Sequence, residues 1–224
     1  MTAYFLTGTD TEIGKTFSAC TLLHAWRAQG LCAAGYKPVA AGADCIDGIW
    51  SNEDARRLLD ASSKGFTLDD VNPVCLRSAI APHIAAKEEG VLLNLPAMID
   101  GFRRLQDRAA RIVVEGVGGF RVPLGQGFDS ADLARELGLP VLLVVGLRLG
   151  CLNHAALSVE AILARGLTLA GWIGNSPTVE SMLRQPENVA SLHTLIPAPC
   201  LGILPHAANA SAADLATLLD LHRL

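Results

Sequence analysis

Short runs of apolar residues recur along the chain, and longer segments with mixed apolar and polar positions separate them. The clearest run is 141–145, which reads Val-Leu-Leu-Val-Val and carries no charge on either face. Continuous runs of this kind are typical of strands that are buried on both faces of a parallel sheet. The pattern predicts strands at Tyr4–Leu6, Ala34–Pro38, Arg111–Glu115, Val141–Val145, Leu167–Ile173 and Cys200–Leu204.

The segments between these runs are expected to form helices, at Lys15–Ala28, Glu53–Asp60, Pro96–Ala110, Ser130–Leu137, Leu152–Ala164, Val179–Leu192 and Ala212–Leu221. This alternation favours the α/β class, with an open, mostly parallel sheet flanked by helices. In such sheets, ligands bind at the carboxyl ends of the strands. The longest stretch of uncertain structure is 39–95, which is too long for a plain connection and is therefore expected to be functional.

Length and composition predict one domain over residues 1–224, because 224 residues, 50% of them hydrophobic, can bury a large core. A net charge of −4 does not favour nucleic acid or an anionic membrane as a partner. The chain has no uncharged apolar run long enough for a transmembrane helix and no basic segment before an apolar run, so we expect no membrane span and no signal peptide.

The six cysteines, at positions 20, 32, 45, 75, 151 and 200, form no Cys-x-x-Cys pair. A metal cluster or a disulfide framework would need closer spacing. Free thiols in a reducing cytoplasm are therefore expected.

The stretch 4–16 carries the most specific chemical signal, because a short apolar strand leads into a turn-rich loop that ends in Gly-Lys-Thr. An apolar, alanine-rich helix is expected to follow at once. The N–H groups and the dipole of a helix N-terminus favour an anion. In a phosphate-binding loop, Lys15 can reach the terminal phosphates and the Thr16 hydroxyl can bind Mg²⁺.

The spacing of this loop departs from the usual pattern. Five residues separate Gly8 from Gly14, and Thr9 stands where the first glycine is expected. The order of strand, loop, Gly-Lys-Thr and helix still matches the context that the motif requires. The alternative is a chance Gly-Lys-Thr at the start of a helix.

Polar residues end two further predicted strands. Lys37 lies in an otherwise apolar strand, either as a site residue or as a surface lysine on an edge strand. Glu115 ends another strand and is followed by Gly116, Gly118 and Gly119. A carboxylate before glycines suits Mg²⁺ binding and a close approach of the backbone to a ligand, although it also occurs at the start of an ordinary turn.

Three more features have both a functional and a purely structural interpretation. The segment 146–154 is a glycine-bearing turn that opens a helix, and it is either a second anion site or a plain cap. Asn175 can pair with an adenine edge but is equally common in turns. Asp54, near the start of a predicted helix, would on its own be interpreted as a carboxylate of the cap region.

Taken together, these motifs resemble those of the dethiobiotin synthetases. The loop 8–16 is similar to the loop of that family, including the five-residue spacing. The other similar segments are Gly35–Val39, Val71–Pro73, Pro82–His83, Val114–Gly116, Leu149–His154, Leu169–Trp172 and Gly202–Pro205. The resemblance covers nearly the whole chain, except for about its last fifteen residues.

The resemblance implies a P-loop NTPase-like fold and ATP- and Mg²⁺-dependent ring closure on 7,8-diaminononanoate (7,8-diaminopelargonic acid) with CO₂, giving dethiobiotin, ADP and phosphate in biotin synthesis. One amine would capture CO₂ as a carbamate, the carbamate would attack the γ-phosphate, and the second amine would close the ring. It also implies a cytoplasmic homodimer whose partners are small-molecule substrates.

Roles for individual residues follow from the same resemblance. Lys15 and Lys37 would be catalytic, through positive charge around the γ-phosphate and the carbamate. Thr16, Asp54 and Glu115 would hold Mg²⁺, directly or through water. The implied ATP-binding residues are Thr11, Glu12, Ile13, Gly14, Lys15, Thr16, Phe17, Asp54, Glu115, Gly116, Val117, Gly118, Asn175, Ser176, Leu204, Pro205 and His206. The implied substrate-binding residues are Lys37, Ala41, Gly118, Gly150, Cys151 and Asn153, the last three reaching the substrate of the partner subunit.

Position 41 departs from the family, which often has Ser where this chain has Ala41, and an alanine side chain cannot replace that hydroxyl.

Two alternatives to the synthetase function remain. A nucleotide switch of the plasmid-partition kind would resemble its relatives in carrying an additional lysine early in the loop, and positions 8–13 contain none. A non-catalytic relative would not be expected to keep the charged residues named above.

Overall fold

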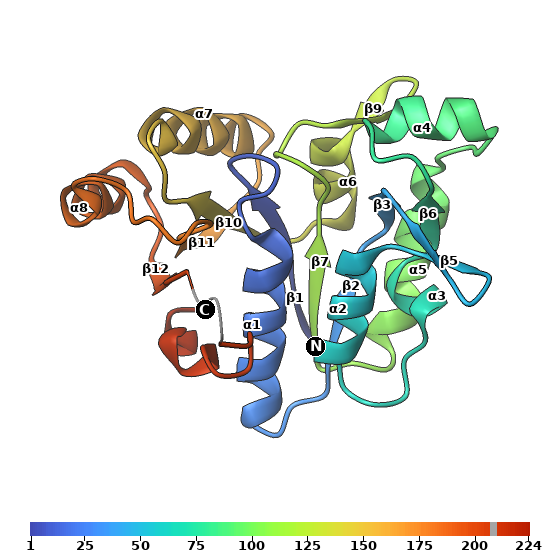
Figure 1. The fold of residues 1–224 in the computed structure, drawn as a ribbon, viewed down its shortest axis with the longest axis horizontal. Helices are drawn as coiled ribbons and strands as arrows, with labels where there is room; N and C mark the ends of the chain where they lie inside the picture. Colours follow the sequence, from blue (N-terminus) through green and yellow to red (C-terminus); the bar gives the residue numbers. More distant parts are fainter. Residues whose placement is uncertain (207–209) are drawn as a thin grey trace.

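The computed structural model describes residues 1–206 and 210–224. Its centre is a sheet of six parallel strands in the order β12-β11-β10-β1-β7-β2 (Figure 1). The strands are β1 (Thr2–Gly8), β2 (Ala33–Tyr36), β7 (Arg111–Glu115), β10 (Val141–Gly146), β11 (Leu169–Asn175) and β12 (Cys200–Leu204). The predicted α/β class with a mostly parallel sheet is confirmed.

The continuous apolar runs are explained by burial of the sheet on both faces. In β1, Phe5 belongs to the apolar cluster on one face and Leu6 to the cluster on the other. In β10, Leu143 and Val144 alternate between the same two clusters. Helices cover both faces, so burial favours apolar residues along the middle of the sheet.

The helices are α1 (Lys15–Ala28), α2 (Glu53–Ala61), α3 (Leu68–Val71), α4 (Pro82–Glu89), α5 (Leu95–Gln106), α6 (Ser130–Leu137), α7 (Cys151–Ala164) and α8 (Gln185–Leu195). Helices α1, α2 and α3 contribute to one apolar cluster, and α4 to α8 contribute to the other. Within the described ranges, none of these helices has both the length and the apolar character needed to cross a membrane.

The stretch 39–95 is well structured but lies mostly outside the main sheet. It holds α2, α3 and α4, the short parallel pair β3 (Val39–Ala41) and β6 (Val74–Leu76), and the hairpin of β4 (Asp44–Ile46) and β5 (Ile49–Ser51). A second small pair, β8 (Pro123–Gly125) and β9 (Phe128–Asp129), precedes α6. These two- and three-residue strands are too short to show an apolar pattern in the sequence.

Two predicted helices are wrong in whole or in part. The helix expected at 179–192 begins only at Gln185, because Arg184 adopts a left-handed conformation and a proline occupies the first turn, where it sets the start of a helix. The helix expected at 212–221 is replaced by turns and two 3₁₀ segments, Ala216–Leu218 and Leu221–Arg223. There the chain follows β12, and the Asp220 N–H donates to the Leu201 carbonyl.

The second predicted strand ends earlier than expected, at Tyr36. Lys37 therefore lies one residue beyond the strand, where its N–H donates to the Val71 carbonyl. Its side chain is 5% exposed, which excludes the interpretation as a surface lysine.

The contact between β2 and α5 generates a stability prediction. Gly101 lies inside α5, where alanine normally stabilises a helix by about 1 kcal/mol. A methyl group at Gly101 would instead collide with the hydroxyl of Tyr36, which is fully buried and donates to the Met98 carbonyl at 2.7 Å. Gly101→Ala is therefore expected to lower the free energy of unfolding by about 1–3 kcal/mol in chemical denaturation.

The matched control removes the colliding atom. Tyr36→Phe/Gly101→Ala should lose less stability than the sum of its single variants, because the hydroxyl is absent. A more stable Gly101→Ala protein would contradict the packing of Tyr36 on α5.

Candidate nucleotide site

Parallel pairing brings the polar strand ends to one edge of the sheet. Leu6 of β1 pairs with Glu115 of β7, so the carboxylate lies beside the strand that leads into the loop 9–14. On the other side, Gly8 pairs with Val144, and the loop after β1 lies near the end of β10. Figure 1 shows this loop entering α1 at the edge where β7 and β10 also end.

The loop 9–14 has the backbone of an anion-binding turn. Glu12 and Gly14 both have left-handed conformations, with φ of 57° and 84°. Any side chain at Gly14 would collide with Asn175, whose Nδ2 donates to the Ile13 carbonyl at 2.8 Å. Among the described residues no side chain caps the first turn of α1, which leaves its N–H groups available to an anion.

Lys15 is held over the loop by a backbone contact. Its Nζ donates to the Asp10 carbonyl at 2.8 Å. The Asp10 carboxylate in turn pairs with Arg148, which lies just after β10. Burial lowers the pKa of Lys15 to about 8, even though nearby carboxylates, mainly Glu115, favour the charged form.

A cluster of charges fills the space between β1, β2 and β7. Lys37 Nζ lies 2.6 Å from Glu115 Oε1 and 3.3 Å from Asp54 Oδ2. The Thr16 hydroxyl donates to the same Glu115 oxygen at 2.8 Å. Burial disfavours the ammonium of Lys37, but the carboxylates of Glu115 and Asp54 outweigh it and raise the pKa of Lys37. Burial likewise favours neutral Asp54, yet Lys37 outweighs it and lowers the pKa of Asp54.

The oxygen atoms in this cluster fit Mg²⁺. The second oxygen of Glu115, Oε2, is buried and has no hydrogen-bond partner in the described part of the chain. Thr16 and Asp54 add a hydroxyl and a second carboxylate next to it. Because Mg²⁺ is commonly bound by one or two carboxylates together with phosphate and water, this small set of oxygens is sufficient. No group of three or more His, Cys, Asp or Glu that could hold a metal is present among the described residues, so a site made of such ligands alone is not found there.

A cavity of about 320 Å³, called the phosphate cavity below, opens onto this cluster. It brings together the predicted residues Thr11, Glu12, Gly14, Lys15, Thr16, Phe17, Lys37, Ala41, Asp54, Glu115, Val117 and Gly118. One lining residue was missed in the sequence, namely Arg57 on α2. It follows Asp54 by three residues, and residues three apart lie on the same side of a helix. This spacing from a predicted site residue is the signal in the sequence that could have identified Arg57.

Other predicted residues lie around this cavity but do not line it. Ile13 packs under the loop against Gly146, and Gly116 borders a smaller space behind the cavity. Asn175, Ser176 and Leu204 meet where β11 and β12 end, and the Ser176 N–H donates to the Leu204 carbonyl at 2.9 Å.

The remaining predicted residues are found in two separate places. Pro205 and His206 follow β12 and are exposed. Gly150 and Asn153 are exposed at the start of α7, whereas Cys151 is buried. None of these three α7 residues lines the phosphate cavity of its own chain.

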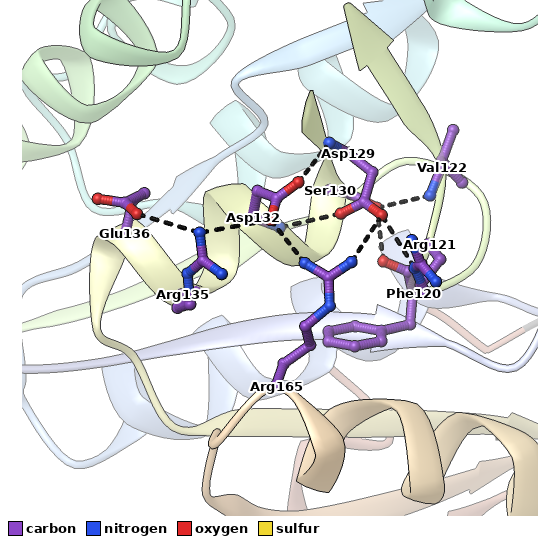
Figure 2. A network of polar contacts seen from close by, with 9 residues as sticks. All are labelled: Phe120, Arg121, Val122, Asp129, Ser130, Asp132, Arg135, Glu136 and Arg165. Carbon is purple, nitrogen blue, oxygen red and sulfur yellow. Dashed lines mark hydrogen bonds and ion pairs between the residues drawn. The ribbon is translucent and has the colours of Figure 1, made fainter. Parts of the chain in front are cut away.

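The glycine-bearing turn that borders the cavity, 116–119, is anchored from behind by a polar network (Figure 2). Buried Ser130 donates to the Phe120 carbonyl at 2.6 Å and accepts from the Val122 N–H at 2.9 Å. Arg165, at the end of α7, contacts Asp129 at 3.3 Å and Asp132 at 2.5 Å, as Figure 2 shows. This network ties residues 120–122, which follow the turn, to both α6 and α7.

Comparison with known sequences identifies the family. A chain from Aromatoleum aromaticum named ATP-dependent dethiobiotin synthetase is 59% identical over 98% of this chain and 97% of its own length. Proteins of the same name from Pseudomonas paraeruginosa and Ralstonia nicotianae are 51% and 49% identical, over 100% and 97% of this chain and 98% and 94% of their own lengths. The chain belongs to the dethiobiotin synthetase family. It is therefore an enzyme of the ligase class. A family model described as AAA domain also matches residues 2–214.

Solved structures show that the synthetase family shares its fold with other P-loop NTPases. A ParA family ATPase from Chlorobium tepidum superposes with a TM-score of 0.59 at 11% identity, over 96% of this chain and 92% of that chain. The MinD cell division protein of Aquifex aeolicus gives 0.55 at 14% identity, over 92% and 83%. At such identities the likeness concerns the fold alone, so it does not favour the partition-type alternative.

The lowered pKa of Lys15 predicts a pH dependence of nucleotide binding. Above pH 8 the free protein loses the Lys15 proton, whereas a bound triphosphate favours the charged ammonium. Binding of MgATP should therefore take up protons, and affinity should fall by up to about tenfold per pH unit as the pH rises above 8. Titration calorimetry at one pH above 8, in two buffers with different heats of ionisation, measures this uptake as the difference between the two binding heats.

Lys15→Arg serves as the control, because a guanidinium stays charged throughout this range. Its binding heat should be the same in both buffers. Equal heats for the unmodified protein would show that Lys15 does not titrate on binding.

Proposed function

We propose that the chain closes a ureido ring on 7,8-diaminononanoate with CO₂ and MgATP, yielding dethiobiotin, ADP and phosphate. The observation that carries this proposal is the convergence of Lys15, Thr16, Lys37, Asp54 and Glu115 in one cavity at the edge of the sheet. The names of the relatives support the reaction class, and the charges suit a phosphoryl transfer coupled to an amine substrate.

The reaction divides into three steps that the site residues would assist. One amine of the substrate attacks CO₂ and loses a proton, which gives a carbamate. A carbamate oxygen then attacks the γ-phosphorus of ATP, and ADP leaves. The second amine attacks the carbonyl carbon of the mixed anhydride and loses a proton, and phosphate leaves as the ring closes.

Lys37 and Lys15 would stabilise the negative charge in these steps. Lys37 is buried, and its carboxylate partners keep it protonated, so it presents a fixed positive charge to the carbamate and the γ-phosphate. Lys15 would leave the Asp10 carbonyl for the phosphates, which offer it stronger charge-assisted hydrogen bonds. Preorganised charge of this kind is the main contribution that a protein makes to phosphoryl transfer.

Thr16, Asp54 and Glu115 are the proposed Mg²⁺ ligands, directly or through water. These residues would hold Mg²⁺, which would supply positive charge that offsets the charge of the nucleotide phosphates. Glu115 would supply the oxygen that has no partner among the described residues, and Lys37 compensates for the charge of buried Glu115 and of partly exposed Asp54.

The loop and the ends of β11 and β12 would hold the nucleotide. Residues 11–17 would surround the phosphates, with the turn 116–118 on the other side. Asn175 donates one N–H of Nδ2 to the Ile13 carbonyl, so its Oδ1 would accept from the amino group of adenine while the second N–H of Nδ2 could still donate. Ser176 and residues 204–206 would complete the adenine pocket.

Gly118, Lys37 and Ala41 are proposed to contact the diamine. At position 41 the side chain offers only a methyl group, and the Asn52 side chain already approaches the Ala41 carbonyl at 3.4 Å. Polar contacts to the amines would therefore depend on neighbouring groups. Residues 1–224 would act as one domain in the cytoplasm, with small molecules rather than nucleic acid or membrane as partners.

The reaction can be tested directly by following dethiobiotin, ADP and phosphate. With diamine, bicarbonate and MgATP present, we expect one ADP and one phosphate for each dethiobiotin, and no ATP consumption without diamine. Lys15→Ala should lower turnover by about a hundredfold or more, since it removes a positioned charge at the transferring phosphate. A normal thermal transition would confirm that this variant is folded.

The alternative function predicts a different result. A partition-type switch would hydrolyse ATP without the diamine, in response to a protein or nucleic-acid partner. Such hydrolysis, with no dethiobiotin formed, would contradict the proposed reaction.

We also propose a homodimer in which Gly150, Cys151 and Asn153 reach the substrate of the partner subunit. Gly150 and Asn153 are exposed, and Leu149 beside them is 93% exposed, so Leu149 offers an apolar side chain to a second copy, whereas Cys151 is buried. The free N–H groups at the start of a helix suit the carboxylate of the diamine.

Mixed dimers test this sharing. Lys15→Ala and Asn153→Asp each damage one half of a shared site, the second by adding a charge that repels the substrate carboxylate while suiting a helix N-terminus. Refolding the two variants together should restore about a quarter of the sites, because one site of each mixed dimer is intact. Each variant refolded alone is the control. No recovery in a sample that contains mixed dimers would show that the sites are not shared.

A further inference from the structure

Arg57 lies on the wall between two neighbouring cavities. One is the phosphate cavity of about 320 Å³, and the other has a volume of about 520 Å³. Arg57 and Phe17 line both of them. The other residues of the larger cavity are Cys20, His24, Asp60, Ala61, Ser211, Ala212 and Ala213.

The backbone of Arg57 is fixed, but its guanidinium can move. Asn52 caps α2 by accepting from the Ala55 N–H at 3.3 Å, and the Cys20 thiol donates to the Arg57 carbonyl at 3.4 Å, which ties α2 to α1. The guanidinium itself contacts only Glu53 among the described residues, at 2.5 Å, and this pair is more than half exposed. An exposed pair one turn apart contributes little, so another anion can replace Glu53 at small cost.

Arg57 contributes to the charge balance of the phosphate cavity. Its lining contains the cations of Lys15, Lys37 and Arg57 and the carboxylates of Glu12, Asp54 and Glu115. Before a nucleotide and its Mg²⁺ enter, the side-chain charges of this lining cancel with Arg57 present, and one carboxylate is in excess without it. Arg57 is also the lining cation with the greatest exposure, whereas Lys37 is already bound to two carboxylates.

The position of Arg57 indicates which phosphates it can reach. Lys15, Lys37 and Glu115 mark the end of the cavity where the terminal phosphate is expected. Arg57 instead shares its wall with Phe17, which follows Thr16 in the first turn of α1 and faces the larger cavity. Phosphates closer to the ribose that pass Phe17 on the way from the loop to the ends of β11 and β12 would lie on the side of the phosphate cavity that Arg57 lines.

We propose that Arg57 is a nucleotide-binding residue that leaves Glu53 and contacts the phosphates common to ATP and ADP. This inference rests on the proposed use of MgATP by the chain. A guanidinium suits the role because it can offer two parallel N–H groups to one phosphate.

Arg56 provides a matched control on the same helix. Its guanidinium donates to the Ser51 carbonyl at 2.8 Å and lies 3.3 Å from Asp44, so it faces the β4–β5 hairpin and does not line either cavity. Calorimetry would measure the Kd of MgATP and of MgADP for the unmodified protein, Arg57→Gln, Arg57→Lys and Arg56→Gln. Circular dichroism and thermal melting would establish that each variant is folded.

We expect Arg57→Gln to weaken binding of both nucleotides by about tenfold, the effect of one lost charge-assisted contact. Arg57→Lys should recover part of this loss, and Arg56→Gln should bind as the unmodified protein does. Equal affinities for Arg57→Gln and Arg56→Gln would overturn the proposal, and a loss confined to ATP would overturn the assignment to the shared phosphates. If the unmodified protein bound no MgATP, the proposed function itself would fail, and this result is distinct from binding that is indifferent to Arg57.

Discussion

The interaction on which this structure depends most is the binding of Lys37 and Thr16 by the buried carboxylate of Glu115. It lies at the end of a central strand, is 1% exposed, and binds both the Lys37 ammonium and the Thr16 hydroxyl. A carboxylate this deeply buried is costly unless opposite charge and hydrogen bonds compensate it. Glu115 therefore joins the end of β2, the start of α1 and the end of β7.

The same arrangement prepares the site for chemistry. Lys37 is held protonated by the two carboxylates, while one oxygen of Glu115 keeps no partner among the described residues. The cluster of Lys37, Asp54 and Glu115 thus carries one net negative charge and one acceptor without a partner in the described part of the chain, as suits a cation that arrives together with a nucleotide. The loop beside it gains its shape from a close backbone approach at Gly14, where Asn175 leaves no room for a side chain.

This chain shares its fold with distant relatives and its family with much more similar proteins. The overall fold is common to the ParA and MinD structures at 11% and 14% identity. The relatives at 49–59% identity are named dethiobiotin synthetases. Ala41 and Arg57 both line the phosphate cavity.

The sequence by itself predicted the six strands of the main sheet, most of the longer helices and the family. Long apolar runs and a phosphate-loop motif are local signals, since they depend only on neighbours in the chain, and α1 and α6 match their predicted bounds. The helix expected at 212–221 failed because that segment follows the edge of β12 through contacts between distant residues.

Only the tertiary structure decided how the site residues meet. The ion pairs of Lys37 with Asp54 and Glu115 join positions 17 and 78 residues apart, and sequence spacing does not encode such a distance. The burial of Lys37, the approach of Asn175 to the loop and the place of Arg57 between two cavities likewise arise from packing. The physical reason is that residue type sets what a group can bind, whereas the pairing of strands and helices sets which groups come within reach.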